Sequence, residues 1–225
     1  MRNLDKIKRL FFLFSIATIG LFILNACKKD DRTIQVSGTI TDASGNKIEG
    51  VTVNLQGTIL QGGAYSSGFS DIASAKTDAN GFYEINTDWQ TVGKYKITLF
   101  KYNYFESSQE YIADDISKGS KVTKNLNINP VAWLKMVVNN TDPYDDSDKI
   151  TFKYDSEETP LCYDCCNNNP TVGRGMIYSN TSKCKLYGNK NAKISWTVLK
   201  HSEVKTFSEN IYCPAFDTTT FNISY

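Results

Sequence analysis

The sequence contains a single histidine and carries almost no net charge, and both features limit the classes of function that it can have. The chain has 225 residues, of which 25 are basic and 24 are acidic. Residues 1–26 hold four of the basic residues and one of the acidic ones, which leaves 21 basic and 23 acidic residues in the rest of the chain. Because a body without a basic surplus does not neutralise phosphates, we expect no nucleic acid among its partners.

Motifs of catalysis are missing as well. The sequence contains no H-E-x-x-H, no G-x-S-x-G and no Gly-rich phosphate loop. The one histidine, His201, lies in a stretch that predicts a turn, where a lone histidine is usually a solvated surface residue. Paired carboxylates that cleave glycosides leave no sequence signature, so a hydrolase remains the least favoured alternative. We therefore expect no enzyme activity and no cofactor.

Long apolar runs are confined to the start of the chain. A basic segment is followed by the uncharged stretch 10–24, which fits the core of a signal peptide and is shorter than the roughly 20 residues of a bilayer span. The following Leu24-Asn25-Ala26-Cys27 resembles the bacterial lipobox. This resemblance implies cleavage before Cys27 and acyl chains on its sulfur and its new amine, which anchor the protein to a membrane. The alternative is an ordinary signal peptide or anchor helix with an incidental cysteine.

The charged residues directly after the lipobox suggest a localisation signal. Lys28, Lys29, Asp30 and Asp31 resemble the surface-export signal of Bacteroidetes lipoproteins. By this resemblance, residues 1–26 are a lipoprotein signal peptide, residues 27–32 are a lipidated linker, and the protein lies on the outer membrane at the cell surface. The plainer interpretation of the four charged residues is a solvated linker.

From residue 33 onward, apolar and polar residues alternate as they do in half-buried strands. The apolar members are Ile34, Val36, Gly38 and Ile40, then Val51, Val53 and Leu55, then Tyr95, Ile97 and Leu99. Turn signals stand at 42–46 and 77–81, a last strand is expected at 122–128, and the Gly- and Ser-rich segment 57–74 is expected to be an exposed loop. No convincing helical repeat is present. Short strands with regular turn signals predict a β-sandwich.

Several motifs of this region have the order and spacing of a known family. They are Gly38-Thr39-Ile40-Thr41-Asp42, Gly50-Val51-Thr52-Val53-Asn54-Leu55, Thr77-Asp78-Ala79-Asn80-Gly81-Phe82-Tyr83 and Tyr95-Lys96-Ile97-Thr98-Leu99. Together they resemble the carboxypeptidase regulatory-like domain over residues 33–128. The resemblance implies a transthyretin-like, seven-stranded β-sandwich of a family of non-catalytic modules. Asn103 stands before Tyr104 where the family usually has glycine, and asparagine tolerates the left-handed conformation of such a turn.

Residues 129–225 predict a second, Cys-containing β-sandwich, with the boundary near Pro130. Alternation favours strands at 132–138, 150–154, 193–199 and 219–225. The segment 159–175 is rich in cysteine and is expected to project from this sandwich as a loop. The fold class is therefore all-β, with two sandwiches in succession.

Five cysteines follow Cys27, and all lie in the second half: Cys162, Cys165, Cys166, Cys184 and Cys213. Export favours disulfides, which leaves one thiol unpaired. Since neighbours pair poorly with each other, Cys165 and Cys166 are each expected to reach Cys184 or Cys213. The alternative is a zinc site of the C-x-x-C at 162–165 with Cys184, His201 and Cys213. A second tight pair of ligands is missing, so disulfides are favoured.

Two further groups are weak candidates for ligand binding. Asp142, Asp145, Asp146 and Asp148 could supply oxygens to calcium, but the Gly and the distal Glu of an EF-hand loop are missing, and a solvated acidic turn is favoured. Tyr102, Tyr104 and Phe105 could form an exposed aromatic platform at a strand end, although strand aromatics more often fill cores.

Taken together, these patterns predict a non-catalytic lipoprotein that serves as a binding or structural module. Its partners would be the membrane, through the lipid anchor, and an outer-membrane protein or a glycan. The alternative is a glycan-binding accessory protein of a polysaccharide-uptake system. A coplanar aromatic pair beside a groove would favour glycan binding, whereas two carboxylates facing each other in a deep cleft would favour a hydrolase.

Overall fold

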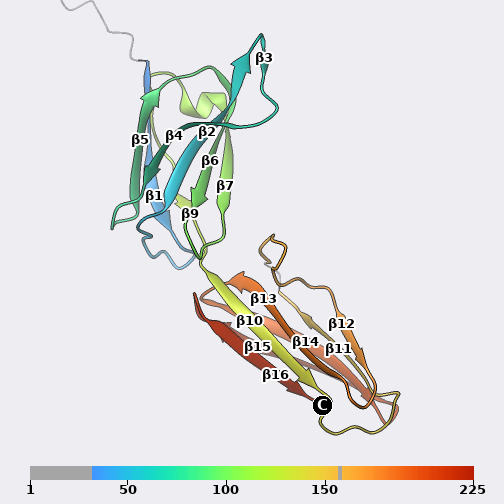
Figure 1. Cartoon of the computed structure of the whole chain (residues 1–225). Coiled ribbons are helices and arrows are strands. Elements are labelled where there is room, and N and C mark those ends of the chain that lie inside the picture. Colours follow the sequence, from blue (N-terminus) through green and yellow to red (C-terminus); the bar gives the residue numbers. More distant parts are fainter. Residues whose placement is uncertain (1–31, 157–158) are drawn as a thin grey trace, which may run out of the picture.

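Two β-sandwiches follow one another along the chain in the computed structural model, which describes residues 32–156 and 159–225 (Figure 1). Within these residues the helical element is a single 3-10 turn, η1 (Ala113–Ile116). The predicted all-β fold class with two sandwiches is confirmed. The expected signal peptide, Cys27 and the charges at 28–31 lie outside the described residues. None of the described helical structure is long and apolar enough to cross a bilayer.

The first sandwich is built from nine strands of the described chain, two of which are only two residues long. They are β1 (Thr33–Thr41), β2 (Thr52–Gln61), β3 (Ala64–Tyr65), β4 (Ser70–Lys76), β5 (Phe82–Asp88), β6 (Val92–Phe100), β7 (Ser107–Ile112), β8 (Lys121–Thr123) and β9 (Leu126–Asn127). One sheet has the order β5-β1-β8, with β9 also paired to β1, and the other has the order β3-β2-β6-β7, with β4 paired to β2.

Alternation places the core of this sandwich as predicted. Ile34, Val36 and Ile40 of β1 are buried, and Val36 lies opposite Ile85 of β5. The glycine that interrupts this apolar series has a steric reason. A Cβ at Gly38 would lie 2.1 Å from the carbonyl oxygen of Lys124, so only glycine lets the segment after β8 pass this close.

The expectation of an exposed loop at 57–74 is wrong. β2 continues to residue 61, and β3 and the first part of β4 follow, so that most of the segment is strand. Gly57 suggested a loop, but it lies within β2, where a Cβ would come within 2.7 Å of Val92 Cγ1 and 2.9 Å of Ile72 Cδ1. Here glycine marks close packing against the core rather than a turn. The expected strand at 122–128 is divided into β8 and β9.

The second sandwich has seven strands in the described chain. They are β10 (Val131–Asn139), β11 (Lys149–Tyr154), β12 (Thr171–Arg174), β13 (Ser179–Tyr187), β14 (Lys190–Lys200), β15 (Glu203–Cys213) and β16 (Thr218–Ser224). A three-stranded sheet, β13-β10-β16, faces a four-stranded sheet, β12-β11-β14-β15. The core includes Leu134, Phe152, Ile194 and Phe221. Strands β12, β13 and β15 were not expected, because polar residues dominate them.

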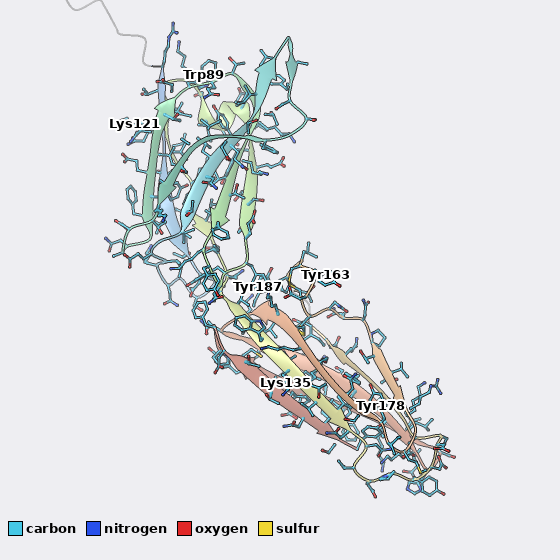
Figure 2. All side chains as sticks on the ribbon, viewed as in Figure 1. Trp89, Lys121, Lys135, Tyr163, Tyr178 and Tyr187 are labelled. Carbon is cyan, nitrogen blue, oxygen red and sulfur yellow. A yellow bond between two sulfur atoms is a disulfide. The ribbon has the colours of Figure 1, made fainter. Side chains whose placement is uncertain are left out.

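The two sandwiches are joined by a short junction, with backbone bonds on both sides of Pro130. Phe105 N donates to Asn129 O at 2.9 Å, and Gly188 N donates to Pro130 O at 2.8 Å. Aromatic rings pack beside these bonds. The rings of Phe105 and Tyr187 meet edge to face at 5.1 Å, and Tyr187 lies where the sandwiches meet in Figure 2. The junction therefore holds the sandwiches end to end without a free linker.

Candidate functional site: a groove at the open edge of the second sandwich

A groove of about 440 Å³ runs between β14, β15 and β16. Its lining residues are Asp142, Trp196, Val198, Lys200, His201, Glu203, Lys205, Phe207, Ser224 and Tyr225. The groove follows from the unequal sheets. Since the three-stranded sheet has one strand fewer than the sheet it faces, β15 is left uncovered, and every residue from 203 to 210 is exposed.

The floor of the groove is a near-parallel aromatic pair. Trp196 of β14 and Phe207 of β15 lie opposite each other in the antiparallel register. Their ring centroids are 5.4 Å apart and their planes differ by 18°. Phe221 meets the indole of Trp196 edge to face at 5.7 Å from below, in the core. Phe207 is 43% exposed, so the pair presents an open apolar surface held in place by the core.

Charged side chains along the rim are largely engaged with one another or with the backbone. Lys200 Nζ donates to Asn140 Oδ1 at 2.9 Å and to the carbonyl oxygen of Asp142, and lies 3.9 Å from Asp148 Oδ2. Lys205 Nζ lies 3.4 Å from Glu203 Oε2. The rim therefore offers polar atoms in both donor and acceptor roles without a surplus of one charge.

Asp148, which is buried beneath the rim, and Tyr225, which is half-buried and lines the groove, have shifted pKa values. Burial alone would raise the pKa of Asp148. Hydrogen bonds from Tyr144 N, Asn140 Nδ2 and Asp145 N, together with the charge of Lys200, lower it by more, so the pKa of Asp148 lies below its ordinary value. Burial, with smaller contributions from Tyr178 and Asp148, raises the pKa of Tyr225 to about 12. At neutral pH Asp148 is therefore ionised and Tyr225 keeps its proton.

His201 closes one end of the groove, in the turn between β14 and β15 where the sequence predicted it. Both turn residues are left-handed, with φ values of 53° at His201 and 61° at Ser202. The imidazole packs on the ring of Tyr144, with ring centroids 3.6 Å apart and planes tilted by 39°. His201 is thus an exposed turn residue at the rim that packs against an aromatic ring.

The predicted acidic turn is partly confirmed and partly corrected. Asp142, Asp145 and Asp146 are exposed, as a solvated turn requires. Asp148 is fully buried, and its carboxylate is satisfied there by hydrogen bonds that it accepts from Asn140 Nδ2 and Tyr144 N, both at 2.9 Å. Donors from the protein thus occupy the oxygens that a calcium ion would need. Within 32–156 and 159–225, no cluster of three or more His, Cys, Asp or Glu could hold a metal ion.

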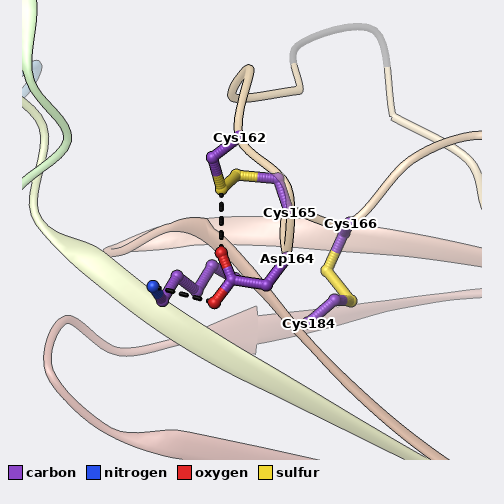
Figure 3. Close-up of a disulfide and its surroundings, with 6 residues drawn as sticks. Cys162, Asp164, Cys165, Cys166 and Cys184 are labelled. Carbon is purple, nitrogen blue, oxygen red and sulfur yellow. Dashed lines mark hydrogen bonds and ion pairs between the residues drawn. A yellow bond between two sulfur atoms is a disulfide. The ribbon is translucent and has the colours of Figure 1, made fainter.

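Two disulfides are present, but one pairing differs from the prediction (Figure 3). Cys166 bonds to Cys184, as the disulfide interpretation allowed. Cys165 does not reach Cys184 or Cys213; it bonds to Cys162, three residues earlier. Cys213 is the free thiol among these five. Because the sulfurs of the C-x-x-C are joined to each other, they are not the thiolates of a zinc site.

The backbone of the cysteine segment explains this pairing. Cys166 N donates to Lys185 O at 2.8 Å and Lys185 N donates to Asp164 O at 2.9 Å, which brings Cys166 beside Cys184 on β13. Cys213 is the last residue of β15, opposite Lys190 of β14, and it is buried in the core, which raises the pKa of its thiol. The expected projecting loop at 159–175 is thus fastened to β13, and its last residues form β12. The tip still projects, since Tyr163 is fully exposed (Figure 2).

The expected aromatic platform of Tyr102, Tyr104 and Phe105 is not formed. Tyr102 is 81% exposed, but Tyr104 packs on Phe216 at 5.4 Å, and Phe105 packs on Tyr187. Both partners belong to the second sandwich, so these rings build the junction. Sequence reasoning missed the aromatic pair at the groove, because the alternation around Trp196 predicts a core position and Phe207 lies on a strand that was not expected.

Comparisons with known proteins show only distant similarity. No family model matches the chain, and no curated protein matches it at a significant level. The TIE protein of Bacillus anthracis is 10% identical, with a TM-score of 0.36, over 85% of this chain and 34% of that protein. A streptococcal ancillary pilin is 14% identical, with a TM-score of 0.31, over 88% and 63%. Catechol 1,2-dioxygenase of Acinetobacter radioresistens is 16% identical, with a TM-score of 0.34, over 46% and 53%.

The chain spans less than two thirds of the length of each of these proteins. Similarity at this level says nothing about function, which has to be inferred from the groove itself.

Proposed function

We propose that the chain is a non-catalytic, lipid-anchored binding module on the outer-membrane surface of a Bacteroidetes-type bacterium, and that its groove binds an extended carbohydrate. The observation that carries the ligand class is the near-parallel pair of Trp196 and Phe207 in an open groove. The apolar C–H face of a sugar ring stacks on such aromatic surfaces, while the polar rim hydrogen-bonds its hydroxyls.

The charges of the rim favour a neutral saccharide. Lys205 is paired with Glu203, and Lys200 is bound to Asn140 and the backbone. An acidic polymer would need unpaired cations in the groove, because burying its carboxylates against engaged lysines leaves them without partners. The proposed ligand is therefore an uncharged oligosaccharide several rings long.

The ligand is tested by titrating the protein with a panel of neutral oligosaccharides and following the tryptophan fluorescence, to which Trp196 contributes, and the heat of binding. Phe207→Ala removes half of the stacking surface and should weaken binding by roughly tenfold. Tyr102→Ala is the control, since Tyr102 is an aromatic residue that is even more exposed than Phe207 but does not line the groove. Equal affinity of the wild type and Phe207→Ala, or no response to any oligosaccharide, would exclude this ligand class.

The anchor is tested separately. Cys27→Ala should abolish the incorporation of labelled fatty acid and release the protein from membranes. Replacing Lys28, Lys29, Asp30 and Asp31 with Ala should keep the lipid but reduce cleavage by proteases added to whole cells. Lipid labelling of Cys27→Ala contradicts the lipobox, and unchanged cleavage of the quadruple variant contradicts the export signal.

A second candidate function is structural support of a neighbouring surface protein. It is favoured by the tip of the cysteine segment, where Leu161 and Tyr163 are 99% and 106% exposed. The Cys166–Cys184 bridge fastens the segment to β13 and the Cys162–Cys165 bridge closes the tip itself, so the tip loses little freedom on contact with a protein. Capture of a surface protein from intact outer membranes that is lost in Leu161→Ala/Tyr163→Ala, while oligosaccharides fail to bind, would favour this function.

A further inference from the structure

Strand β15 presents a long open edge. It pairs with β14 along its whole length, and no other strand of the described chain pairs with it. The two-residue turn at 201–202 makes Lys200 and Glu203 a hydrogen-bonded pair, so the odd-numbered residues of β15 bond to β14. The N–H and C=O groups of Val204, Thr206, Ser208 and Asn210 therefore point away from the sheet. Such an edge is a template for another strand.

The charges on β15 select which strand fits. On the groove side its side chains run Glu203, Lys205, Phe207, Glu209, in an acidic, basic, aromatic, acidic order. A second copy of β15, antiparallel and related by a two-fold axis through Phe207, places Lys205 opposite Glu209 on both sides of the axis. Opposite charges directly across two strands stabilise the pairing.

Other registers of the same pairing are disfavoured by the same charges. An axis through Thr206 places Glu203 opposite Glu209, and an axis through Lys205 or Glu209 places that residue opposite itself. An axis through Ser208 places Glu209 against the ring of Phe207. An axis through Val204 places Glu203 opposite Lys205, but it overlaps only residues 203–205 of β15, because residues 201 and 202 form the turn. Like charges directly opposite destabilise a strand pair, so among the registers with a long overlap the edge accepts its own copy in one and resists the others. At the favoured axis Phe207 meets its copy in a non-hydrogen-bonded pair, where side chains approach most closely.

We propose that β15 is a homodimer interface, through which two copies of the chain pair antiparallel about a two-fold axis at Phe207. The two four-stranded sheets become one continuous sheet. Both copies use the same strand, so the interface is isologous. The grooves of the two copies then adjoin, and the two Trp196–Phe207 pairs form a row of four rings across four strands. The dimer does not depend on the proposed ligand; if both hold, the ligand is long enough to cross the axis.

The interface is tested by sedimentation of the full chain in detergent over a range of concentrations. The wild type should dimerise, whereas Lys205→Glu, which creates two pairs of like charges, should weaken dimerisation by roughly tenfold or more. Glu209→Lys should do the same. The exchange Lys205→Glu/Glu209→Lys restores both opposite-charge pairs, so it should restore the dimer, which also shows that the single variants fold.

Cross-linking tests the register. Phe207→Cys should form a disulfide-linked dimer on mild oxidation, because the two thiols face each other across the axis. Lys205→Cys is the matched control: Lys205 is more exposed than Phe207 and lies on the same face, but it faces Glu209 across the axis and should not cross-link. A monomeric wild type, a charge exchange that fails to restore the dimer, or equal cross-linking of both cysteine variants would overturn the proposal. No sugar is needed, so these outcomes are independent of carbohydrate binding.

Discussion

The two residues of the turn between β14 and β15 carry backbone strain at the rim of the groove. His201 and Ser202 have φ values of 53° and 61°. A two-residue hairpin turn of this kind favours Asn-Gly, because a residue with a Cβ in the left-handed region costs about 1–2 kcal/mol. The contact between the rings of His201 and Tyr144 offsets part of this strain at the first position. Ser202 has no such contact, so the strain at the second position is open to relief.

Ser202→Gly should therefore raise the free energy of unfolding by about 1 kcal/mol, since glycine adopts positive φ without steric cost. Urea unfolding followed by circular dichroism measures the change. The matched control is Ser208→Gly on β15, where the backbone is extended and glycine should lower the free energy of unfolding. If both glycine variants are destabilised alike, the turn is not strained.

Asp148 is the buried charge that organises the acidic turn, and its removal should lower the free energy of unfolding. Asn140 and Tyr144 both donate to Oδ2, where the amide oxygen of Asp148→Asn can still accept. Its amide nitrogen then faces the N–H of Asp145, which donates to Oδ1 at 3.5 Å in the wild type. Leaving a buried donor unsatisfied costs about 1–3 kcal/mol of unfolding free energy at neutral pH.

The loss should depend on pH in one direction. Because the pKa of folded Asp148 lies below the ordinary value of 3.8, the carboxylate stabilises the fold fully above that value. The stabilisation is lost as the pH falls below 3.8 through the folded pKa. The melting temperatures of the wild type and Asp148→Asn should therefore converge in acid and stay apart at neutral pH. A gap that is the same at both pH values would contradict this role.

At the scale of elements, strands that bury one face were predictable and strands at the edges were not. Ile34, Val36 and Ile40 alternate because one face of β1 is sealed in the core, and the period of two follows directly. On β15 nothing covers either face from 203 to 210, so burial imposes no pattern on the sequence. The groove could not be predicted from the sequence for the same reason, because it lies where a strand lacks a covering sheet. In the sequence, Phe207 cannot be told from any other isolated aromatic residue.

The two disulfides should differ in how much they stabilise the second sandwich. The Cys166–Cys184 bridge joins residues 18 apart and the Cys162–Cys165 bridge joins residues 3 apart. Since a longer closed loop restricts the unfolded chain more, Cys166→Ala/Cys184→Ala should lose about 3 kcal/mol and Cys162→Ala/Cys165→Ala about 2 kcal/mol or less. Denaturant unfolding followed by the fluorescence of Trp133 and Trp196 measures both. A larger loss from the short bridge would show that it fastens more than its own loop.

The molecule as a whole depends on the junction between the sandwiches. β9 ends at Asn127 and β10 begins at Val131, which leaves no length of chain for a flexible linker. Backbone bonds anchor this segment to the first sandwich through Asn103 O and to the second through Gly188 N. Tyr104 and Phe105 extend the contact by packing on Phe216 and Tyr187. The position of the groove relative to the first sandwich is therefore set by the junction.

If the junction couples the sandwiches, they should unfold together until its rings are removed. The reporters are variants that keep either Trp89, in the first sandwich, or Trp133 and Trp196, in the second. Their transitions should coincide in the otherwise unchanged chain. Each aromatic pair contributes about 0.5–1.5 kcal/mol beyond burial, so Tyr104→Ala/Phe105→Ala should remove most of the coupling and separate the two transitions. Tyr102→Ala, which is 81% exposed, should leave them coincident. Separate transitions before the rings are removed would show that the backbone bonds and rings do not couple the sandwiches.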